Sequence, residues 1–300
     1  MASSLRDKLK SGVFVMTAEV TPPLSSNPAD LLEKALPLKG YADAVNVTDG
    51  ASARAHLDSM IAATILLNNG IEPILQLTCR DRNRIALQSE LVGASALGIH
   101  NVLVLTGDDP KKGDQPDAKP VFDLDSAGLM ATAAHIRDKG ELPHGRKVGG
   151  SPDYFIGAAD APIDPPADWT PKSLLKKVES GAQFAQTQFC MDVGVVRRYM
   201  QRLADHGVTE KLYFLIGVAP LSSAKSARWM KENLFGTIIP DAFVDRMGAA
   251  TDPKKEGQKI AIEVLQELAE IPGVSGAHLM APLNEAAIPG VIEAVRAGRG

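Results

Sequence analysis

Two carboxylates, Glu19 and Asp108, stand where apolar runs of the chain end, in the segments Thr17-Ala-Glu19 and Thr106-Gly107-Asp108. A carboxyl group that faces an apolar wall is desolvated, which raises its pKa and suits it to act as a general acid near neutral pH. Each residue also has a simpler interpretation, in which Glu19 pairs with a lysine and Asp108 caps the turn before Asp109-Pro110. The occurrence of both at the ends of such runs favours a role in chemistry.

Other apolar runs also end in polar or small residues, namely Asn46-Val-Thr48, Gln76-Leu-Thr78, Gly157-Ala158-Ala159 and the pair Gln186 and Gln188, with Asn284 after the last run. A run without bulky side chains lets a planar ring or a diphosphate approach the backbone, although a tight turn needs small residues too. Lys176 and Lys177 could reach a phosphate, but such a pair is more often a solvated helix face.

Signatures of metal and nucleophile chemistry are absent from the sequence. The histidines are scattered at positions 56, 100, 135, 144, 206 and 278, with no His-x-x-x-His pair and no cysteine close to one. No Gly-x-Ser-x-Gly segment occurs either. We therefore expect no metal site, and acids, amides and small residues without a nucleophile indicate a site that uses an organic cofactor.

The elements that position these residues are short, nearly continuous apolar runs, each followed by an amphipathic segment. Such runs are typical of parallel strands covered on both faces. We expect strands at residues 13–20, 42–48, 72–78, 100–106, 153–158, 184–190, 211–218 and 276–280.

The intervening segments carry helix signals. Asn27-Pro28 supplies an N-cap and a first-turn proline, and Thr170-Pro171 opens a helix that Gly181 closes. Leu57, Ile61 and Ile65 recur at a spacing of four within residues 54–69, before a C-terminal glycine at position 70.

This alternation of strands and helices predicts an α/β protein, a (β/α)8 TIM barrel in which residues 1–300 form one catalytic domain. A doubly wound open sheet is the alternative, but no Gly-x-Gly-x-x-Gly follows any run. The connection from Gly107 to Leu124 is expected to be a surface loop over one barrel mouth.

Composition excludes several classes of protein. Apolar residues make up 45% and charged residues 23% of 300 residues, as in ordinary globular proteins. A net charge of −4 gives no basic footprint for nucleic acid, and no apolar segment reaches the roughly 18 residues of a membrane span. Two cysteines make no disulfide framework, so we expect a cytoplasmic protein without a membrane partner.

The ordered segments Thr17-Ala-Glu19-Val-Thr-Pro-Pro23, Leu77-Thr78-Cys79, Leu105-Thr-Gly-Asp108, Thr187-Gln188-Phe189 with Asp192, and Gly217-Val-Ala-Pro-Leu-Ser222 resemble the motifs of methylenetetrahydrofolate reductases. The resemblance runs from about Phe14 to the last helix. It implies a (β/α)8 flavoprotein that uses FAD to interconvert 5,10-methylenetetrahydrofolate and 5-methyltetrahydrofolate, in one-carbon metabolism and methionine biosynthesis, with NAD(P)H as the usual electron partner.

The resemblance also implies residue roles. Glu19 matches the general acid that helps open the imidazolidine ring, and Asp108, Gln188 and Asn284 are expected to bind the folate. Asp108 also matches a position near the flavin. FAD is expected to contact Thr48, Ala51, Gly107, Gly157, Ala158, Ala159, Lys176 and Lys177.

Several family positions differ in this chain. The aromatic residue that stacks on the nicotinamide dinucleotide corresponds to Ala224, which offers no stacking face. A tyrosine corresponds to Asp49, a histidine to Gln76, and two arginines to Thr106 and Glu285. These differences favour another electron partner, and they make the oxidative direction, from methyl- to methylenetetrahydrofolate, a hypothesis.

Two alternatives remain open at this point. One is a flavin-free pterin-binding barrel, such as a methyltransferase that passes a methyl group from methyltetrahydrofolate to a corrinoid protein. The other is a non-catalytic folate-binding subunit, against which the retained Glu19, Asp108 and Gln188 count. A homo-oligomer is compatible with the reductase and with both alternatives.

Overall fold

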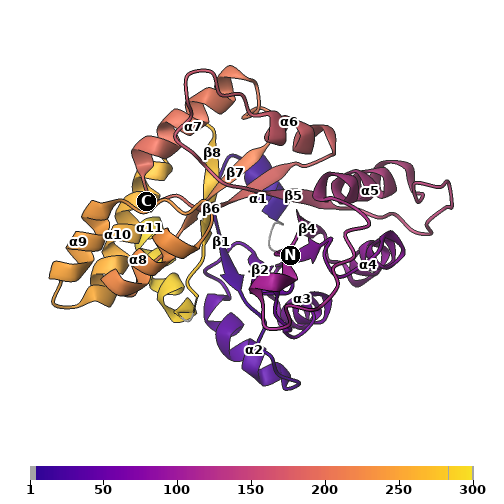
Figure 1. Cartoon of the computed structure of the whole chain (residues 1–300), viewed down its shortest axis with the longest axis horizontal. Coiled ribbons are helices and arrows are strands. Elements are labelled where there is room, and N and C mark those ends of the chain that lie inside the picture. The colour runs from indigo at the N-terminus through magenta and orange to yellow at the C-terminus, as the bar shows by residue number, and fades with distance from the viewer. Residues whose placement is uncertain (1–4, 283, 299–300) are drawn as a thin grey trace.

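Eight parallel strands close into a barrel in the computed structural model, which describes residues 5–282 and 284–298. Each strand pairs with the next along the chain, and β1 closes the ring against β8. The predicted (β/α)8 fold is thereby confirmed, and Figure 1 shows helices around the central strands. The strands are β1 (Val15–Val20), β2 (Val45–Val47), β3 (Pro73–Thr78), β4 (Asn101–Leu105), β5 (Phe155–Asp160), β6 (Phe184–Phe189), β7 (Tyr213–Val218) and β8 (Val274–Leu279).

One helix precedes β1, and the others follow the strands along the chain, three of them between β7 and β8. They are α1 (Leu5–Lys10), α2 (Pro28–Ala35), α3 (Ser59–Asn68), α4 (Arg84–Leu97), α5 (Ser126–Lys139), α6 (Lys172–Glu179), α7 (Val193–Asp205), α8 (Ala224–Asn233), α9 (Asp241–Ala249), α10 (Pro253–Leu268) and α11 (Ile288–Ala297). The side chain of Asn27 accepts a hydrogen bond from Ala29 N, so the predicted cap of α2 is confirmed.

The predicted start of α3 is wrong. The helix begins at Ser59, after Asp58 caps it by accepting from Ile61 N, and not at residue 54. The expected apolar stripe is confirmed at Leu57 and Ile65, which pack against the core, but is wrong at Ile61, which is 51% exposed. The fully buried face carries Ala62, Ala63 and Leu66. The residues before Asp58 instead form the 3-10 turn Ala51–Ala53 and an extended segment that follow β2.

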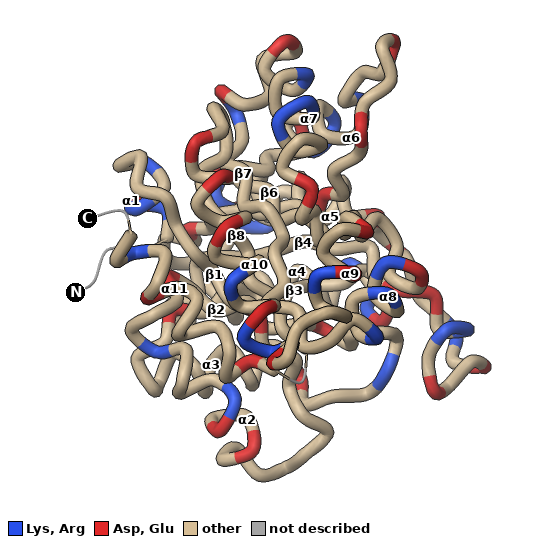
Figure 2. Tube along the Cα trace, turned by 90° about the vertical axis from the view of Figure 1, so that its left-hand side faces the viewer, with Lys and Arg blue, Asp and Glu red and all other residues tan. Residues whose placement is uncertain are grey.

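The barrel interior has an apolar floor at the amino-terminal end of the strands. Leu5 and Leu9 of α1 pack there in one buried cluster with Val15, Phe155 and Phe184. Between the strands and the surrounding helices lies the larger apolar core. Lysine, arginine and the acidic residues are interspersed along the outer segments (Figure 2), and among the described residues no helix is long and apolar enough to cross a membrane.

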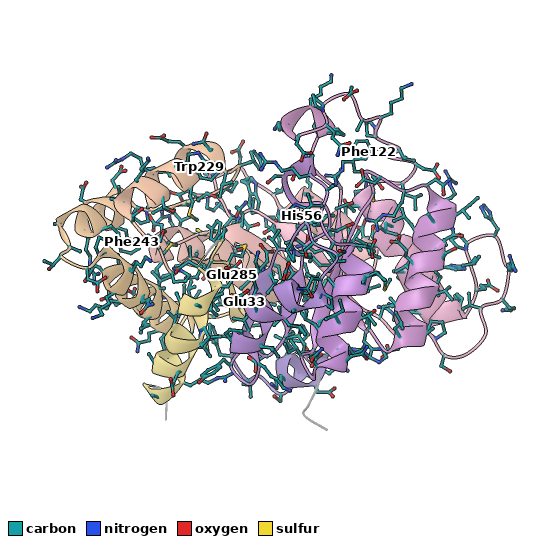
Figure 3. All side chains as sticks on the ribbon, turned by 90° about the horizontal axis from the view of Figure 1, so that it is seen from below. Glu33, His56, Phe122, Trp229, Phe243 and Glu285 are labelled. Atoms are coloured by element: carbon teal, nitrogen blue, oxygen red, sulfur yellow. The ribbon has the colours of Figure 1, made fainter. Side chains whose placement is uncertain are left out.

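The connection between β4 and α5 lies over the turn that follows β2. A Cβ at Gly113 would overlap the Ala53 carbonyl, so the two segments are in direct contact. The predicted loop at the carboxyl ends of the strands is thus confirmed for this side of the barrel. Figure 3 shows Phe122, from this connection, and Trp229, from α8, toward the same edge of the molecule.

Candidate functional site

Polar side chains line the barrel interior above its apolar floor. Because side chains alternate along a strand, residues two apart share a face. Thr17 and Glu19 on β1 therefore point the same way, as do Asn46 and Thr48 at β2. Buried polar residues at the corresponding level of other strands include Gln76, Gln186 and His278.

Glu19 is held at the carboxyl end of β1 by neighbours on two adjacent strands. Its Oε2 accepts a hydrogen bond from Asn46 Nδ2 at 2.9 Å and lies 3.5 Å from His278 Nε2. The Glu19 side chain is 20% exposed, so it is mostly enclosed but still faces the mouth. The structure gives it no lysine partner among the described residues, which removes the simpler interpretation of Glu19.

His278 was not predicted as a site residue. It lies on β8 opposite Thr17 of β1 in the strand register, and its Nδ1 is 3.0 Å from Thr17 Oγ1 and 3.3 Å from Gln186 Nε2. The signal in the sequence was a single histidine inside an apolar strand, two residues after Gly276 and therefore on the same face of the strand. That pattern identifies an interior position, but not its neighbours on other strands.

Asp108 lies at the exposed rim, with β2 and β3 between its strand and β1. Its Oδ2 accepts a hydrogen bond from Ser52 N at 3.1 Å. Ser52 and Ala53 both have positive φ, 57° and 54°, a conformation that costs non-glycine residues energy. Asp108 thus stabilises a strained turn after β2. The simpler interpretation, that it caps the turn before Asp109-Pro110, is wrong, because Asp109 itself caps that turn by accepting from Lys111 N.

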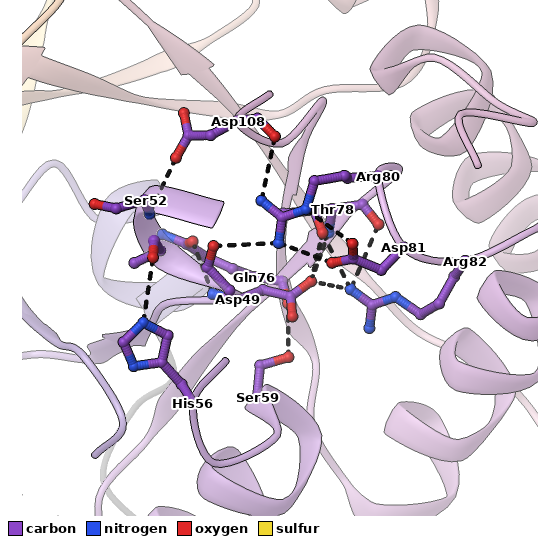
Figure 4. A network of polar contacts seen from close by, with 12 residues as sticks. Asp49, Ser52, His56, Ser59, Gln76, Thr78, Arg80, Asp81, Arg82 and Asp108 are labelled. Carbon is purple, nitrogen blue, oxygen red and sulfur yellow. Dashed lines mark hydrogen bonds and ion pairs between the residues drawn. The ribbon is translucent and has the colours of Figure 1, made fainter. Parts of the chain in front are cut away.

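Asp49 anchors a polar network beside this turn (Figure 4). Its Oδ2 accepts hydrogen bonds from Thr78 N at 2.8 Å and Thr78 Oγ1 at 2.9 Å, and it is paired with Arg82. Arg82 also contacts Glu90 at 2.7 Å. Burial raises the pKa of Glu90, and Arg82 opposes that shift. The carboxylate of Asp49 is therefore occupied by contacts within the protein.

Arg80 ties the loops after β2, β3 and β4 together. Its guanidinium donates to Gly50 O at 3.2 Å and Asp108 O at 3.4 Å, and it pairs with Asp81 at 2.8 Å. Gly107, with φ of 96°, allows this approach, because a Cβ there would lie 2.9 Å from Arg80 Cβ. A glycine is required at position 107 for packing within the protein itself.

The small residues of β5 lie in different environments. Gly157 faces the interior, where a Cβ would overlap the Phe184 ring, and Ala158 is fully buried among the outer core. Ala159 lies nearer the end of the strand, and its carbonyl accepts from Lys177 Nζ at 2.6 Å. Internal packing therefore explains why positions 157 and 158 are small.

Lys176 does not share the contact that Lys177 makes with the Ala159 carbonyl. It forms an exposed pair with Asp125 at 3.3 Å.

A cavity of about 330 Å³ lies next to Lys177, lined by Asp160, Trp169 and Tyr199 among others. Burial raises the pKa of Asp160, which accepts a hydrogen bond from Tyr199 OH at 2.7 Å.

Gln188 lies on β6, and Asn284 follows β8, which stands across the ring from the strand before Asp108. A register shift between β6 and β7 falls at Gln186 and Phe189, and Gln188 Oε1 accepts from Phe189 N at 3.0 Å. Asn284 Nδ2 donates to Pro220 O at 3.5 Å. Each side chain thus has an internal partner, and their contact with a ligand stays a prediction.

Some buried polar atoms of this interior have no partner within the described structure. They are Thr48 Oγ1, Asn46 Oδ1 and Gln186 Oε1. Buried polar groups are normally hydrogen-bonded, so these atoms indicate that a polar molecule enters the mouth. Within the described residues no cluster of His, Cys, Asp and Glu could hold a metal ion.

Comparison with known proteins gives a consistent family. A family model described as methylenetetrahydrofolate reductase matches residues 4–296. "5,10-methylenetetrahydrofolate reductase" of Pectobacterium carotovorum is 27% identical over 246 residues, covering 78% of this chain and 73% of that protein. "Methylenetetrahydrofolate reductase 2" of Schizosaccharomyces pombe is 25% identical over 286 residues, 88% of this chain and 42% of that protein. The chain spans about two fifths of the length of the fission yeast relatives.

A solved structure shares the fold. An uncharacterized protein from Clostridium thermocellum, whose description says that it binds two copies of 5-methyl-5,6,7,8-tetrahydrofolic acid, superposes with a TM-score of 0.69 at 14% identity. The match covers 98% of this chain and 99% of that one.

Proposed function

The chain belongs to the methylenetetrahydrofolate reductase family, and on that premise we propose that it is an FAD-dependent oxidoreductase that interconverts 5,10-methylenetetrahydrofolate and 5-methyltetrahydrofolate. The observation that carries this proposal is Glu19, a mostly enclosed carboxyl group without a lysine partner among the described residues, at the mouth of the barrel. Catalytic groups of such barrels lie at this end of the strands.

The buried polar atoms without partners support a bound FAD. Thr48 directly follows β2 and precedes the turn Ala51–Ala53. Asp108 contacts that turn at Ser52 N, so the loop with Gly107 and Asp108 lies against it. A flavin ring has both donors and acceptors along its edge, which suits a hydroxyl and an amide oxygen. We infer that Thr48, Ala51, Gly107 and Asp108 contact the ring.

The β5 side supports the remainder of such a dinucleotide. Lys177 of α6 donates to the Ala159 carbonyl at the end of β5, and both Lys177 and Lys172 line the 330 Å³ cavity. We infer that Lys177 faces a phosphate, with Lys176 reaching it after its exposed pair with Asp125 opens. When bound, FAD supplies or accepts a hydride.

The protein's own part in the reaction is proton transfer and orientation. Glu19 gives a proton to the ring nitrogen that leaves carbon as the imidazolidine opens, and it takes that proton back in the oxidative direction. Asp108 suits the pterin, because the adjacent N–H donors of the pterin ring match the two oxygens of the Asp108 carboxylate. Gln188 and Asn284 complete the folate contacts in this proposal.

A Glu19→Gln variant tests the role of Glu19. Glutamine keeps the shape but cannot donate a catalytic proton, so the folate half-reaction should slow by roughly 10² to 10⁴-fold. Stopped-flow measurement of flavin absorbance would report it, with the exposed Glu33→Gln on α2 as the matched control. Equal rates for the two variants would remove Glu19 from the mechanism.

We also propose that the electron partner is not NADH in the family's usual pose. Ala224 begins α8 and has no ring on which a nicotinamide dinucleotide could stack. Thr106, at the family's arginine position, is exposed. Anaerobic mixing with NADH should therefore reduce the flavin much more slowly than methyltetrahydrofolate does, and reduction at the turnover rate would contradict the proposal.

A further inference from the structure

The contacts of Glu19 are confined to one of its two oxygens. Asn46 Nδ2 donates to Oε2 at 2.9 Å, and His278 Nε2 faces the same Oε2 at 3.5 Å. Among the described residues nothing donates to Oε1. The two oxygens of this carboxyl group are therefore not equivalent.

The position of the proton on His278 follows from its other neighbours. A glutamine amide nitrogen only donates hydrogen bonds, and Gln186 Nε2 lies 3.3 Å from both Thr17 Oγ1 and His278 Nδ1. Thr17 Oγ1 is 3.0 Å from Nδ1. Thr17 Oγ1 also lies 3.4 Å from Ala277 O, to which it can donate. Because the Gln186 amide nitrogen faces Nδ1 and can only donate, Nδ1 is the acceptor of the ring, and Nε2 carries the hydrogen and points it at Glu19.

Burial supports the same assignment. The His278 side chain is 3% exposed, and an imidazolium there would point its Nδ1 hydrogen at the amide hydrogens of Gln186. An uncharged ring with its proton on Nε2 avoids this conflict.

We propose that His278 is a positioning residue for Glu19: as a neutral imidazole with its hydrogen on Nε2, it acts with Asn46 to hold Oε2 in place, so that Oε1 is the oxygen that carries the catalytic proton. This inference rests on the function proposed for Glu19. In the reductive direction the Oε1–H bond breaks, the proton moves to the departing ring nitrogen, and Oε2 of the carboxylate that remains keeps its hydrogen bond from Asn46 and its neighbour His278 Nε2.

A separation of 3.5 Å is long for a hydrogen bond. Catalytic hydrogen bonds commonly shorten when the substrate binds. Binding of 5-methyltetrahydrofolate should therefore shift the His278 resonances more than those of His206, which caps the exposed end of α7.

Nitrogen NMR of the full chain labelled with ¹⁵N-histidine tests the proposal directly. The His278→Gln spectrum assigns the resonances, and the wild-type protein should show a protonated Nε2 and an unprotonated Nδ1 near neutral pH. An imidazolium, or a proton on Nδ1, would overturn the proposal. A reversed Gln186 amide would place its oxygen beside Nδ1 and would require a hydrogen there, which is one of the two results that overturn the proposal.

Two variants separate positioning from packing. His278→Leu fills the space without a donor, whereas His278→Gln places an amide N–H near the former Nε2. We expect His278→Leu to lower kcat about a hundredfold with little change in the Kd of 5-methyltetrahydrofolate, and His278→Gln to recover at least tenfold of that loss. Equal loss in both variants, or a loss seen only in Kd, would contradict a positioning role.

The NMR result does not depend on turnover. A flavin that methyltetrahydrofolate reduces, together with the wrong tautomer, would refute only the role of His278. The predicted tautomer in a protein that binds neither flavin nor folate would refute only the proposed function.

Discussion

Replacing Asp49 tests whether the network beside the barrel mouth is structural. Asp49→Ala removes the acceptor of two hydrogen bonds from Thr78 and the partner of Arg82. Both ionic side chains are largely buried, with exposures of 11% for Asp49 and 14% for Arg82. Losing one member of a buried pair costs about 3 to 5 kcal/mol, and because Glu90 still neutralises Arg82, we expect about 3 kcal/mol.

Urea unfolding followed by far-UV circular dichroism would measure this loss as a lower midpoint at constant slope. Asp123→Ala is the matched control, because its pair with Arg84 is solvent-exposed and should contribute little. A double-mutant cycle with Arg82→Met should give a coupling of about 2 kcal/mol between Asp49 and Arg82. Equal midpoints for Asp49→Ala and Asp123→Ala, or no coupling in the cycle, would refute the argument.

Further predictions concern packing and pH. Gly157→Ala should lower the free energy of unfolding by about 1 to 3 kcal/mol, because the methyl group overlaps Phe184. Gly93→Ala, in open space on α4, should raise it by about 0.5 to 1 kcal/mol in the same urea assay. Tyr199→Phe should cost about 1 to 3 kcal/mol, because Asp160 loses its donor; an unchanged midpoint would contradict this. Burial raises the pKa of Asp160 above its ordinary 3.8, so its stabilising contribution is full below 3.8 and is lost as pH rises through the folded value. Asp160→Asn should therefore gain stability relative to wild type as pH rises from 3.8 through the folded pKa of Asp160, and a difference that is constant across that window would disprove it.

The barrel was predictable because its strands carry their own signal. Runs such as residues 213–218, within the strand expected at 211–218, are apolar on both faces, and such runs occur where a parallel strand is covered on both sides. The start of α3 was not predictable from spacing alone. Ile61 matched an apolar stripe but lies 51% exposed, while the cap at Asp58 set where the helix begins.

The candidate site was predictable only in part. Glu19 could be found because it is a carboxylate at the end of an apolar strand. The environment of Glu19 could not, since Asn46 and His278 come from β2 and β8, and strand register decides that they meet. Gly157 shows the same limit, because its small size is explained by Phe184 on the neighbouring strand.

An anaerobic absorbance titration of the purified protein with 5-methyltetrahydrofolate tests the central claim most directly. We expect an oxidised flavin band at about 450 nm, after addition of FAD where needed. 5-Methyltetrahydrofolate should bleach this band. The absence of any flavin band in the presence of added FAD would contradict the account and favour a flavin-free pterin-binding barrel.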